Sequence, residues 1–303
     1  MRKSVELARA VGDVVAGRVR ADEPLARHTS FRIGGPADVL ATPDTALELA
    51  AIARAAAEAG ASLTILGGGS NMLVGDGGIR GVVVKLGRGF RRIDWDPPCV
   101  EAGAAVQLGR LARDAAERGL AGLEYAEGIP GTVGGALFMN AGAYGGEVSE
   151  TVDEVEGVDA SGAVRRLARA SLAFVYRRTM LPAGFLVTAV RFRLRPEAST
   201  SVQARLAQAR DRRIASQPHG QANAGSIFKN PPGDFAGRLV EAAGLKGTRV
   251  GGARISEQHG NFIVNEGAAH ATDVQALMQE AQRVVWERNG VWLEPEVRLV
   301  GSW

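Results

Sequence analysis

The sequence predicts an α+β protein built in two parts, and three observations lead to this expectation. Apolar stretches of strand length are interspersed with stretches of helical periodicity. The 303 residues suffice for about two domains of ordinary size. A polar break, PEAST at 196–200, separates two regions. We therefore expect a first domain over residues 1–196 and a smaller one over 197–303.

The first region is expected to start with an amphipathic helix, since apolar residues recur at helical spacing from Leu7 to Val15. The elements expected next are strands and helices in mixed order: a strand at 37–41, a helix at 42–60, strands at 62–66, 81–86 and 99–104, a helix at 106–119, a hairpin turning at 159–162 and an alternating strand at 185–196. Its fold class is α+β.

The second region is expected to hold a basic helix, a loop, a short helix and a strand, at 202–216, 217–233, 234–244 and 260–265. A last helix should start with a T-x-x-Q capping box at Thr272 and Gln275 and stop at Asn289-Gly290. In VWLEPEVR the period of two places Glu294, Glu296 and Arg298 on one face of a strand.

Composition describes a soluble, enzyme-like chain, with 46% hydrophobic and 23% charged residues. The charged amino terminus lacks a signal-peptide core, and the single Cys99 cannot form an internal disulfide, so a cytoplasmic location is expected. A net charge of +3 with scattered basic residues gives no support for nucleic-acid binding. Only four of the 36 basic residues are lysines: Lys3, Lys85, Lys229 and Lys246.

Several kinds of site are disfavoured by the motifs. The four histidines show no paired metal-binding spacing, so no metal site is expected. The chain has no P-loop, no G-x-S-x-G and no plausible Cys–His pair. GGGSNM at 67–72 starts like a dinucleotide fingerprint but puts Met72 at the third glycine, and no helical pattern follows, which disfavours a Rossmann unit.

Two glycine-rich loops stand out, ILGGGSNMLV and GIPGTVGGALFMNAGAYGG. The second, at 128–146, has seven glycines in nineteen uncharged residues, a composition unlike that of a membrane span. Glycine lets backbone N–H groups approach an anion or a flat ring closely. Together with Asn71, Thr132, Asn140 and Tyr144, the loops suit a ligand with a diphosphate and a planar ring. Packing glycines in a crowded core are the alternative.

Other motifs have ordinary explanations when taken singly. Ser226, Lys229 and Asn230 lie within AGSIFKNP, where a serine next to glycine is most often a turn or cap residue. Glu294 and Glu296 could lie on a solvated edge strand, as Pro295 suggests. Tyr176, Arg177 and Arg178 could form a surface turn.

The motifs are more specific as an ordered set: HTSFRIGGPAD, ILGGGSNML, GIPGTVGGALFMNAGAYG, YRRT, AGSIFKNP, GLKG and LEPEVR. In this order the chain, over about residues 22–301, resembles the UDP-N-acetylenolpyruvoylglucosamine reductase family, in the shorter of its two subtypes. The resemblance implies an FAD-binding domain of the p-cresol methylhydroxylase and vanillyl-alcohol oxidase type, followed by a smaller α+β substrate-binding domain.

The resemblance also implies roles for individual residues. Arg177, Ser226 and Glu296 are the expected catalytic residues, with Ser226 donating a proton. Non-covalent FAD is expected to contact a set of loop residues: Arg32, Gly67, Gly68, Gly69, Ser70, Asn71, Met72, Gly128, Ile129, Pro130, Gly131, Thr132, Gly134, Gly135, Asn140 and Gly142. The substrate is expected to contact Tyr144, Lys229, Asn230 and Lys246.

The implied reaction has two halves, in which NADPH reduces the flavin and the flavin then reduces UDP-N-acetylglucosamine enolpyruvate with ping-pong kinetics. The implied setting is peptidoglycan precursor synthesis. The sequence departs from the family pattern at Thr179, commonly serine, and at HGNFIVN, which replaces the usual H-A-G and affects the wall near Ile263. The alternatives are another FAD-dependent oxidase or dehydrogenase of the same superfamily, and a nucleotide-sensing or nucleic-acid-associated binding module. A monomer is favoured, without nucleic-acid or membrane partners.

Overall fold

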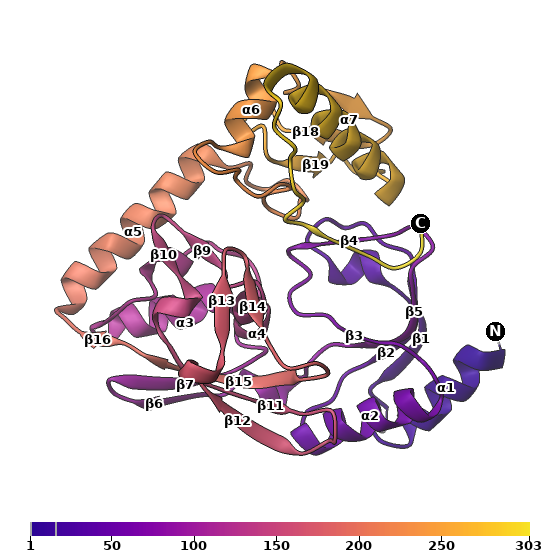
Figure 1. Ribbon diagram of the computed structural model, residues 1–303. Helices are drawn as coiled ribbons and strands as arrows, with labels where there is room; N and C mark the ends of the chain where they lie inside the picture. Colours follow the sequence, from indigo (N-terminus) through magenta and orange to yellow (C-terminus); the bar gives the residue numbers. More distant parts are fainter. Residues whose placement is uncertain (1, 16) are drawn as a thin grey trace. The chain divides into compact units, whose positions relative to one another are not determined.

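The computed structural model describes residues 2–15 and 17–303, which form two compact units (Figure 1). Unit 1 comprises Met1–Ala21, Val39–Gly68 and Gly81–Arg213, and unit 2 comprises Asp22–Asp38, Gly69–Arg80 and Ile214–Trp303. Unit 2 thus includes two segments from the first part of the chain. The division at residue 196 into an FAD-binding and a substrate-binding domain stays a prediction. No helix in the described ranges has the length and hydropathy needed to cross a membrane.

A five-stranded antiparallel sheet dominates unit 1, in the order β12-β11-β15-β7-β6. Its strands are β6 (Ile93–Asp96), β7 (Cys99–Gly103), β11 (Val152–Val158), β12 (Val164–Ala168) and β15 (Leu186–Arg193). Val155 pairs with Val190, which in turn pairs with Ala102. These residues form one core with Leu111 of α3 (Leu108–Glu117) and Leu137 of α4 (Val133–Phe138). The hairpin expected at 159–162 is confirmed.

A second sheet has the order β1-β2-β5-β3. Its strands are β1 (Val19–Pro24), β2 (Pro36–Ala41), β3 (Leu63–Ile65) and β5 (Ile79–Val84). Apolar residues of α1 (Arg2–Gly12) and α2 (Ala46–Glu58) form a core with strand residues such as Val82 and Val84. Thr45 and Glu48 form a reciprocal capping box at the start of α2, which confirms the helix expected there.

Shorter elements complete unit 1. The strands are β8 (Leu120–Ala121), β9 (Gly142–Ala143), β10 (Gly146–Glu147), β13 (Ala173–Val175), β14 (Arg178–Met180) and β16 (Arg195–Pro196). The 3-10 helices of the chain are η1 (Leu25–His28), η2 (Arg88–Arg91), η3 (Glu124–Ala126), η4 (Val148–Glu150) and η5 (Arg169–Ser171). Helix α5 (Ser199–Ser216) starts inside the polar PEAST stretch, because Ser199 and Thr200 already belong to its first turn.

Unit 2 combines α6 (Ala236–Ala242) and α7 (Ala271–Asn289) with a sheet of β17 (Arg249–Val250), β18 (Ala253–Ile255) and β19 (Ile263–Asn265). In addition β4 (Met72–Val74) and β20 (Arg298–Val300) pair in parallel. Ile227, Leu239, Val264 and Leu277 are among its most deeply buried residues.

Two expectations for unit 2 are wrong. The capping box at Thr272 and Gln275 does not form, because α7 starts at Ala271 and Asp76 accepts hydrogen bonds from the N–H groups of Ala271 (2.8 Å) and Thr272 (3.2 Å). The strand expected over VWLEPEVR starts only at Arg298; before it, a single antiparallel pair joins Pro295 to Phe228, with Lys229 N–H donating to Glu294 O (2.8 Å) and Glu296 N–H donating to Ile227 O (2.8 Å).

Candidate active site

The two glycine-rich loops lie side by side in unit 1. A Cβ atom on Gly68 would lie 2.8 Å from the Cα atom of Gly131, and one on Gly67 would lie 3.0 Å from Thr132 Oγ1. Real Cβ atoms essentially never come within 3.0 Å of another heavy atom. Main chain therefore packs directly on main chain here, which is the glycine packing that the sequence left open as the alternative to a ligand contact.

Thr132 lies opposite Gln107, and only its two neighbours along the chain form hydrogen bonds to that segment. Leu108 N–H donates to Gly131 O (3.1 Å) and Val133 N–H donates to Val106 O (2.9 Å). Gln107 and Thr132 are thus a non-hydrogen-bonded antiparallel pair, whose own peptide groups point outward. The Thr132 hydroxyl caps α4 by accepting a hydrogen bond from Gly135 N–H (3.4 Å). We call the main chain of Gly67, Gly68, Gly131 and Thr132 the glycine cradle.

Arg213 lies near both Gly128, at the start of the second glycine-rich loop, and Tyr144, near its end. The sequence did not indicate Arg213 as a site residue. A Cβ atom on Gly128 would lie 2.6 Å from Arg213 Cδ, and the guanidinium lies 5.8 Å from the ring centre of Tyr144. Burial lowers the pKa of Arg213. The signal was hidden because Arg213 belongs to the run RDRR, which is typical of a solvated helix face.

Left-handed backbone conformations coincide with the predicted site. Among the described residues, five non-glycine residues have clearly positive φ angles, and four of them were predicted site residues: Arg32 (55°), Asn140 (41°), Tyr144 (53°) and Arg177 (59°). Such conformations cost free energy for side chains other than glycine, and they concentrate at functional sites. The backbone therefore singles out residues that the motifs had already selected.

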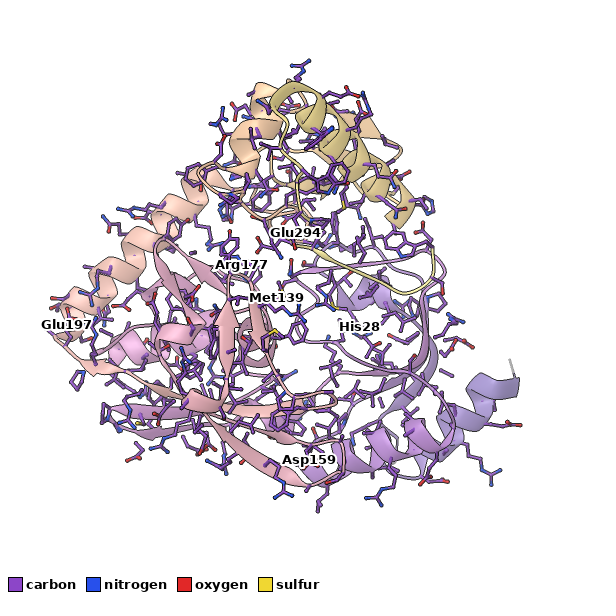
Figure 2. All side chains as sticks on the ribbon, viewed as in Figure 1. His28, Met139, Asp159, Arg177, Glu197 and Glu294 are labelled. Carbon is purple, nitrogen blue, oxygen red and sulfur yellow. The ribbon has the colours of Figure 1, made fainter. Side chains whose placement is uncertain are left out.

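Two of these residues lie in tight two-residue turns of unit 1. Tyr144 and Gly145 connect β9 to β10, and Tyr176 and Arg177 connect β13 to β14. Arg177 is labelled in Figure 2. The Arg177 guanidinium lies 4.7 Å from the ring centre of Tyr176. Asn140 is fully buried; its amide accepts from Ser149 N–H (3.0 Å) and donates to Val175 O (3.2 Å). Its side-chain hydrogen bonds are thus made within the protein.

In unit 2, the main chain of Glu296 is hydrogen-bonded to Ile227, the residue that follows Ser226. Glu296 N–H donates to Ile227 O (2.8 Å), directly after Ser226. The Asn71 amide donates to Glu296 O (3.1 Å), and Arg298 N–H donates to Asn71 O (3.0 Å). Two predicted site residues, Asn71 and Glu296, are therefore held in one hydrogen-bonded frame with Ile227, the residue after Ser226.

The remaining residues of the first glycine loop also belong to unit 2. A Cβ atom on Gly69 would lie 2.2 Å from His28 O, so only glycine fits there. Met72 is the first residue of β4 and pairs with Arg298. Ser70 lies between Gly69 and Met72 in the chain. Arg32 is exposed.

The predicted substrate-binding residues of unit 2 already have protein partners. Lys229 pairs with Glu294, and Lys246 Nζ lies 3.1 Å from Glu241 Oε1. Asn230 Oδ1 accepts a hydrogen bond from Ala236 N–H (3.1 Å) at the start of α6. Burial, and secondarily the charge of Lys246, lowers the pKa of His259, whose Nδ1 accepts from Asn261 N–H (3.1 Å). His259 is thus held neutral near Lys246.

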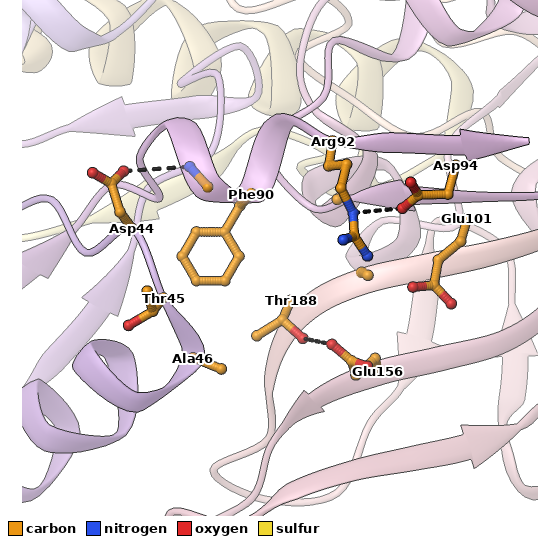
Figure 3. Close-up of a pocket in the computed structure, with 12 residues that line it drawn as sticks. Asp44, Thr45, Ala46, Phe90, Arg92, Asp94, Glu101, Glu156 and Thr188 are labelled. Carbon is orange, nitrogen blue, oxygen red and sulfur yellow. Dashed lines mark hydrogen bonds and ion pairs between the residues drawn. The ribbon is translucent and has the colours of Figure 1, made fainter.

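A pocket of about 220 Å³ in unit 1 lies apart from these residues (Figure 3). Carboxylates dominate its polar lining, and Thr188 donates to Glu156 (3.0 Å) while Arg92 pairs with Asp94. None of the predicted site residues lines it. An acidic lining does not suit an anionic ligand, so we do not assign the reaction to this pocket.

Comparison with known proteins gives two matching family models. An FAD binding domain matches residues 37–168, and the UDP-N-acetylenolpyruvoylglucosamine reductase C-terminal domain matches residues 217–300. UDP-N-acetylenolpyruvoylglucosamine reductase 2 of Symbiobacterium thermophilum is 48% identical over 94% of this chain and 93% of its own length. The chain belongs to the UDP-N-acetylenolpyruvoylglucosamine reductase family.

Solved structures agree with this family assignment. UDP-N-acetylenolpyruvylglucosamine reductase from Thermus caldophilus has a TM-score of 0.81 and 41% identity, covering 91% of this chain and 97% of that one. p-Cresol methylhydroxylase, at 16% identity, has a TM-score of 0.50 over 65% of this chain and 44% of its own. This second likeness concerns the fold alone, and it supports the expected type of FAD domain.

The residues present fit FAD. The FAD-domain match includes Gly67, Gly68 and the second glycine loop, and the close contact of Gly68 with Gly131 leaves bare main chain on both loops. The N–H groups of Val133, Gly134 and Gly135 are bonded within the protein, whereas glycine main chain with an outward-facing N–H group, as at Thr132, suits a diphosphate or a flat ring. This reductase family member is therefore an FAD-dependent oxidoreductase.

Proposed function

We propose that this protein reduces UDP-N-acetylglucosamine enolpyruvate to UDP-N-acetylmuramate with electrons from NADPH, a step of peptidoglycan precursor synthesis and thus of cell-wall formation. The observation that carries the proposal is the 48% identity to a reductase over 94% of the chain. The hydrogen-bonded frame around Ser226 and Glu296 supports it, since these residues lie in the matched C-terminal domain or at its edge.

The cofactor would be held mainly by backbone. The residues proposed to hold it are Gly67, Gly68, the loop from Gly128 to Gly135, Arg32 and Gly69 to Met72. Gly142 starts β9, next to the Tyr144 turn. Bound FAD supplies the transfer of hydride from NADPH to the vinyl carbon of the substrate.

The chain's own residues would manage the charge and the proton. Addition of hydride to the vinyl carbon leaves the neighbouring α carbon with an electron pair that spreads onto the carboxylate. Arg177 would offset this charge, and Glu296 would act at the same carboxylate-bearing carbon. The Ser226 hydroxyl would donate its proton to the α carbon, which completes the new C–H bond.

The substrate's uridine diphosphate sugar would be recognised by Lys246, Asn230 and Lys229, with Tyr144 as a further contact. The two lysines are paired with the exposed carboxylates of Glu241 and Glu294, and exposed pairs of this kind contribute little stability. A diphosphate can therefore replace these carboxylates at small cost. We also propose a cytoplasmic location, which the water-soluble nucleotide substrate supports, and a monomeric state.

An anaerobic turnover assay tests the proposal against an oxidase of the same superfamily. NADPH oxidation should depend on UDP-N-acetylglucosamine enolpyruvate and proceed without oxygen, with UDP-N-acetylmuramate as product. NADPH oxidation that needs oxygen and ignores the enolpyruvyl substrate would favour the oxidase. A protein that binds no flavin but binds polyanions in a strongly salt-dependent way would favour the binding module.

A further inference from the structure

The turn that carries Arg177 lies at the end of a two-stranded ribbon, whose Phe174 packs against the core of unit 1. Strands β13 and β14 form a ribbon of only two strands, with Val175 opposite Arg178. An isolated two-stranded ribbon is marginally stable in water. Val175, Tyr176 and Met180 are exposed, so little apolar packing fixes the end of this ribbon. Arg177 also holds a left-handed conformation, which requires support from its surroundings.

Two side-chain hydrogen bonds connect this ribbon to the glycine-rich segment. The buried Thr179 hydroxyl donates to Leu137 O in α4, and the Asn140 amide donates to Val175 O (3.2 Å). Val175 directly precedes the turn and Thr179 lies two residues after Arg177, so each strand of the ribbon has one such bond close to the turn, and the bond on the β13 side comes from Asn140. Figure 1 shows α4 beside the β13–β14 ribbon.

Asn140 is itself fixed in place. Its side chain has no exposed surface, and its Oδ1 atom accepts from Ser149 N–H (3.0 Å). Because that N–H group requires an oxygen, the amide nitrogen must point toward Val175 O. Its φ of 41° is one that asparagine tolerates better than most residues. The side chain thus has one orientation, and both its ends are used.

We propose that Asn140 is a positioning residue for Arg177, acting through the Val175 carbonyl rather than through a side-chain contact with the cofactor. The proposal rests on the role proposed above for Arg177. In unit 1 this role would connect the cofactor-binding glycines to Arg177. The segment that begins at Gly128 leads to Asn140, and Asn140 bonds to the strand before the Arg177 turn.

The substitution Asn140→Asp tests this directly. Aspartate has the same size, tolerates positive φ and keeps the oxygen that accepts from Ser149, but it places a second oxygen against Val175 O. In the FAD-loaded protein, reoxidation of reduced flavin by the enolpyruvyl substrate should slow by about 10- to 100-fold. Reduction of the flavin by NADPH should stay within about twofold of wild type.

A matched control and a double variant separate positioning from general damage. Asn289→Asp makes the same change at an exposed residue at the end of α7 and should leave both half-reactions unchanged. In an Arg177→Gly background, Asn140→Asp should cause no further loss of reoxidation, because residues that act as a unit are not additive. An equal fold-loss in both backgrounds, or an equal loss in both half-reactions, would overturn the proposal.

Hydrogen exchange gives a readout that does not depend on catalysis. Backbone amides of residues 173–180 should exchange at least about tenfold faster in Asn140→Asp, while those of β11 and β15 keep their protection. Wild-type exchange in this ribbon would contradict the proposal even if activity fell. If wild type itself did not reduce the enolpyruvyl substrate, the proposed function would fail, and the exchange result would still decide whether Asn140 holds the turn.

A second variant covers the case in which Asn140→Asp does not fold. Asn140→Gly adopts the left-handed conformation freely and removes both side-chain hydrogen bonds. It should give the same pattern, with faster exchange in residues 173–180 and slower reoxidation. Wild-type behaviour of this folded variant in both measurements would reject the positioning role.

Discussion

Ser226 is half-buried and directly precedes Ile227, whose carbonyl bonds to Glu296 N–H. A neutral hydroxyl is a weak acid, but it can protonate a strongly basic carbon when a cation offsets the charge. Ser226→Ala should therefore leave NADPH reduction of the flavin almost intact and slow reoxidation by substrate by about 100-fold or more. Rapid-mixing absorbance of each half-reaction checks this, and an equal loss in both would remove the proton-donor role.

Arg177 combines a reactive role with an unfavourable backbone conformation. At a φ of 59° glycine relieves the steric cost of a side chain, while it adds entropy to the unfolded chain. We expect Arg177→Gly to unfold with a free energy within about 1 kcal/mol of wild type, yet to lose reoxidation by substrate. Denaturant titration and the second half-reaction test this pair of outcomes. Severe destabilisation would indicate a structural arginine instead.

At the scale of elements, the contact between the glycine loops is the feature most open to test. Gly68→Ala would place a Cβ atom 2.8 Å from Gly131 Cα and force the loops apart. Overpacking of this kind costs about 1–3 kcal/mol, so FAD affinity should fall about tenfold or more. Equilibrium dialysis measures it. Gly12→Ala is the matched control, because a Cβ atom there meets nothing within 4 Å. Equal FAD affinity in both variants would count against the cradle.

The start of α7 gives a pH-dependent prediction. Burial raises the pKa of Asp76, but hydrogen bonds from Ala271 and Thr272 outweigh it, so the net pKa is below the ordinary 3.8. The resulting stability is complete above that value and is lost as the pH falls through the lower folded pKa. Asp76→Ala should cost about 1–2 kcal/mol at neutral pH and progressively less below about pH 4.

Denaturant titrations of wild type and Asp76→Ala at neutral and acidic pH measure this difference. The exposed Asp211 of α5 provides the control, since Asp211→Ala should leave stability nearly unchanged at both pH values. A difference between wild type and Asp76→Ala that grew on acidification would show that the carboxylate does not support α7 as described.

Across the whole molecule, the sequence predicted local elements better than long-range partners. The helix expected at 42–60, the hairpin at 159–162 and the stop of α7 at Gly290 depend on local signals, and each is confirmed. The capping box of α7 was predicted two residues too late, since the local pair is His270 N–H donating to Asp273 (2.9 Å); the second carboxylate at this end, Asp76, lies 195 residues away from Ala271. A pattern of neighbouring residues contains no information about such a partner.

The site shows the same limit. Glycine content predicted two ligand-binding loops, and the structure places Gly68 against Gly131. The roles of Ser226 and Glu296 came only from resemblance, because a serine and a glutamate 70 residues apart carry no local signal. Asn140 was assigned to the cofactor by its position in a glycine loop, whereas its partners Ser149 and Val175 are visible only in the fold.

The proposed function requires a flavin that is reduced by NADPH and reoxidised by the enolpyruvyl substrate. The decisive measurement is the anaerobic absorption spectrum of the FAD-supplemented protein, recorded first after NADPH and then after UDP-N-acetylglucosamine enolpyruvate. If the protein has the proposed function, the oxidised-flavin spectrum bleaches with NADPH and returns with the substrate. A protein that retains no FAD, or a reduced flavin that the substrate leaves bleached, would contradict it.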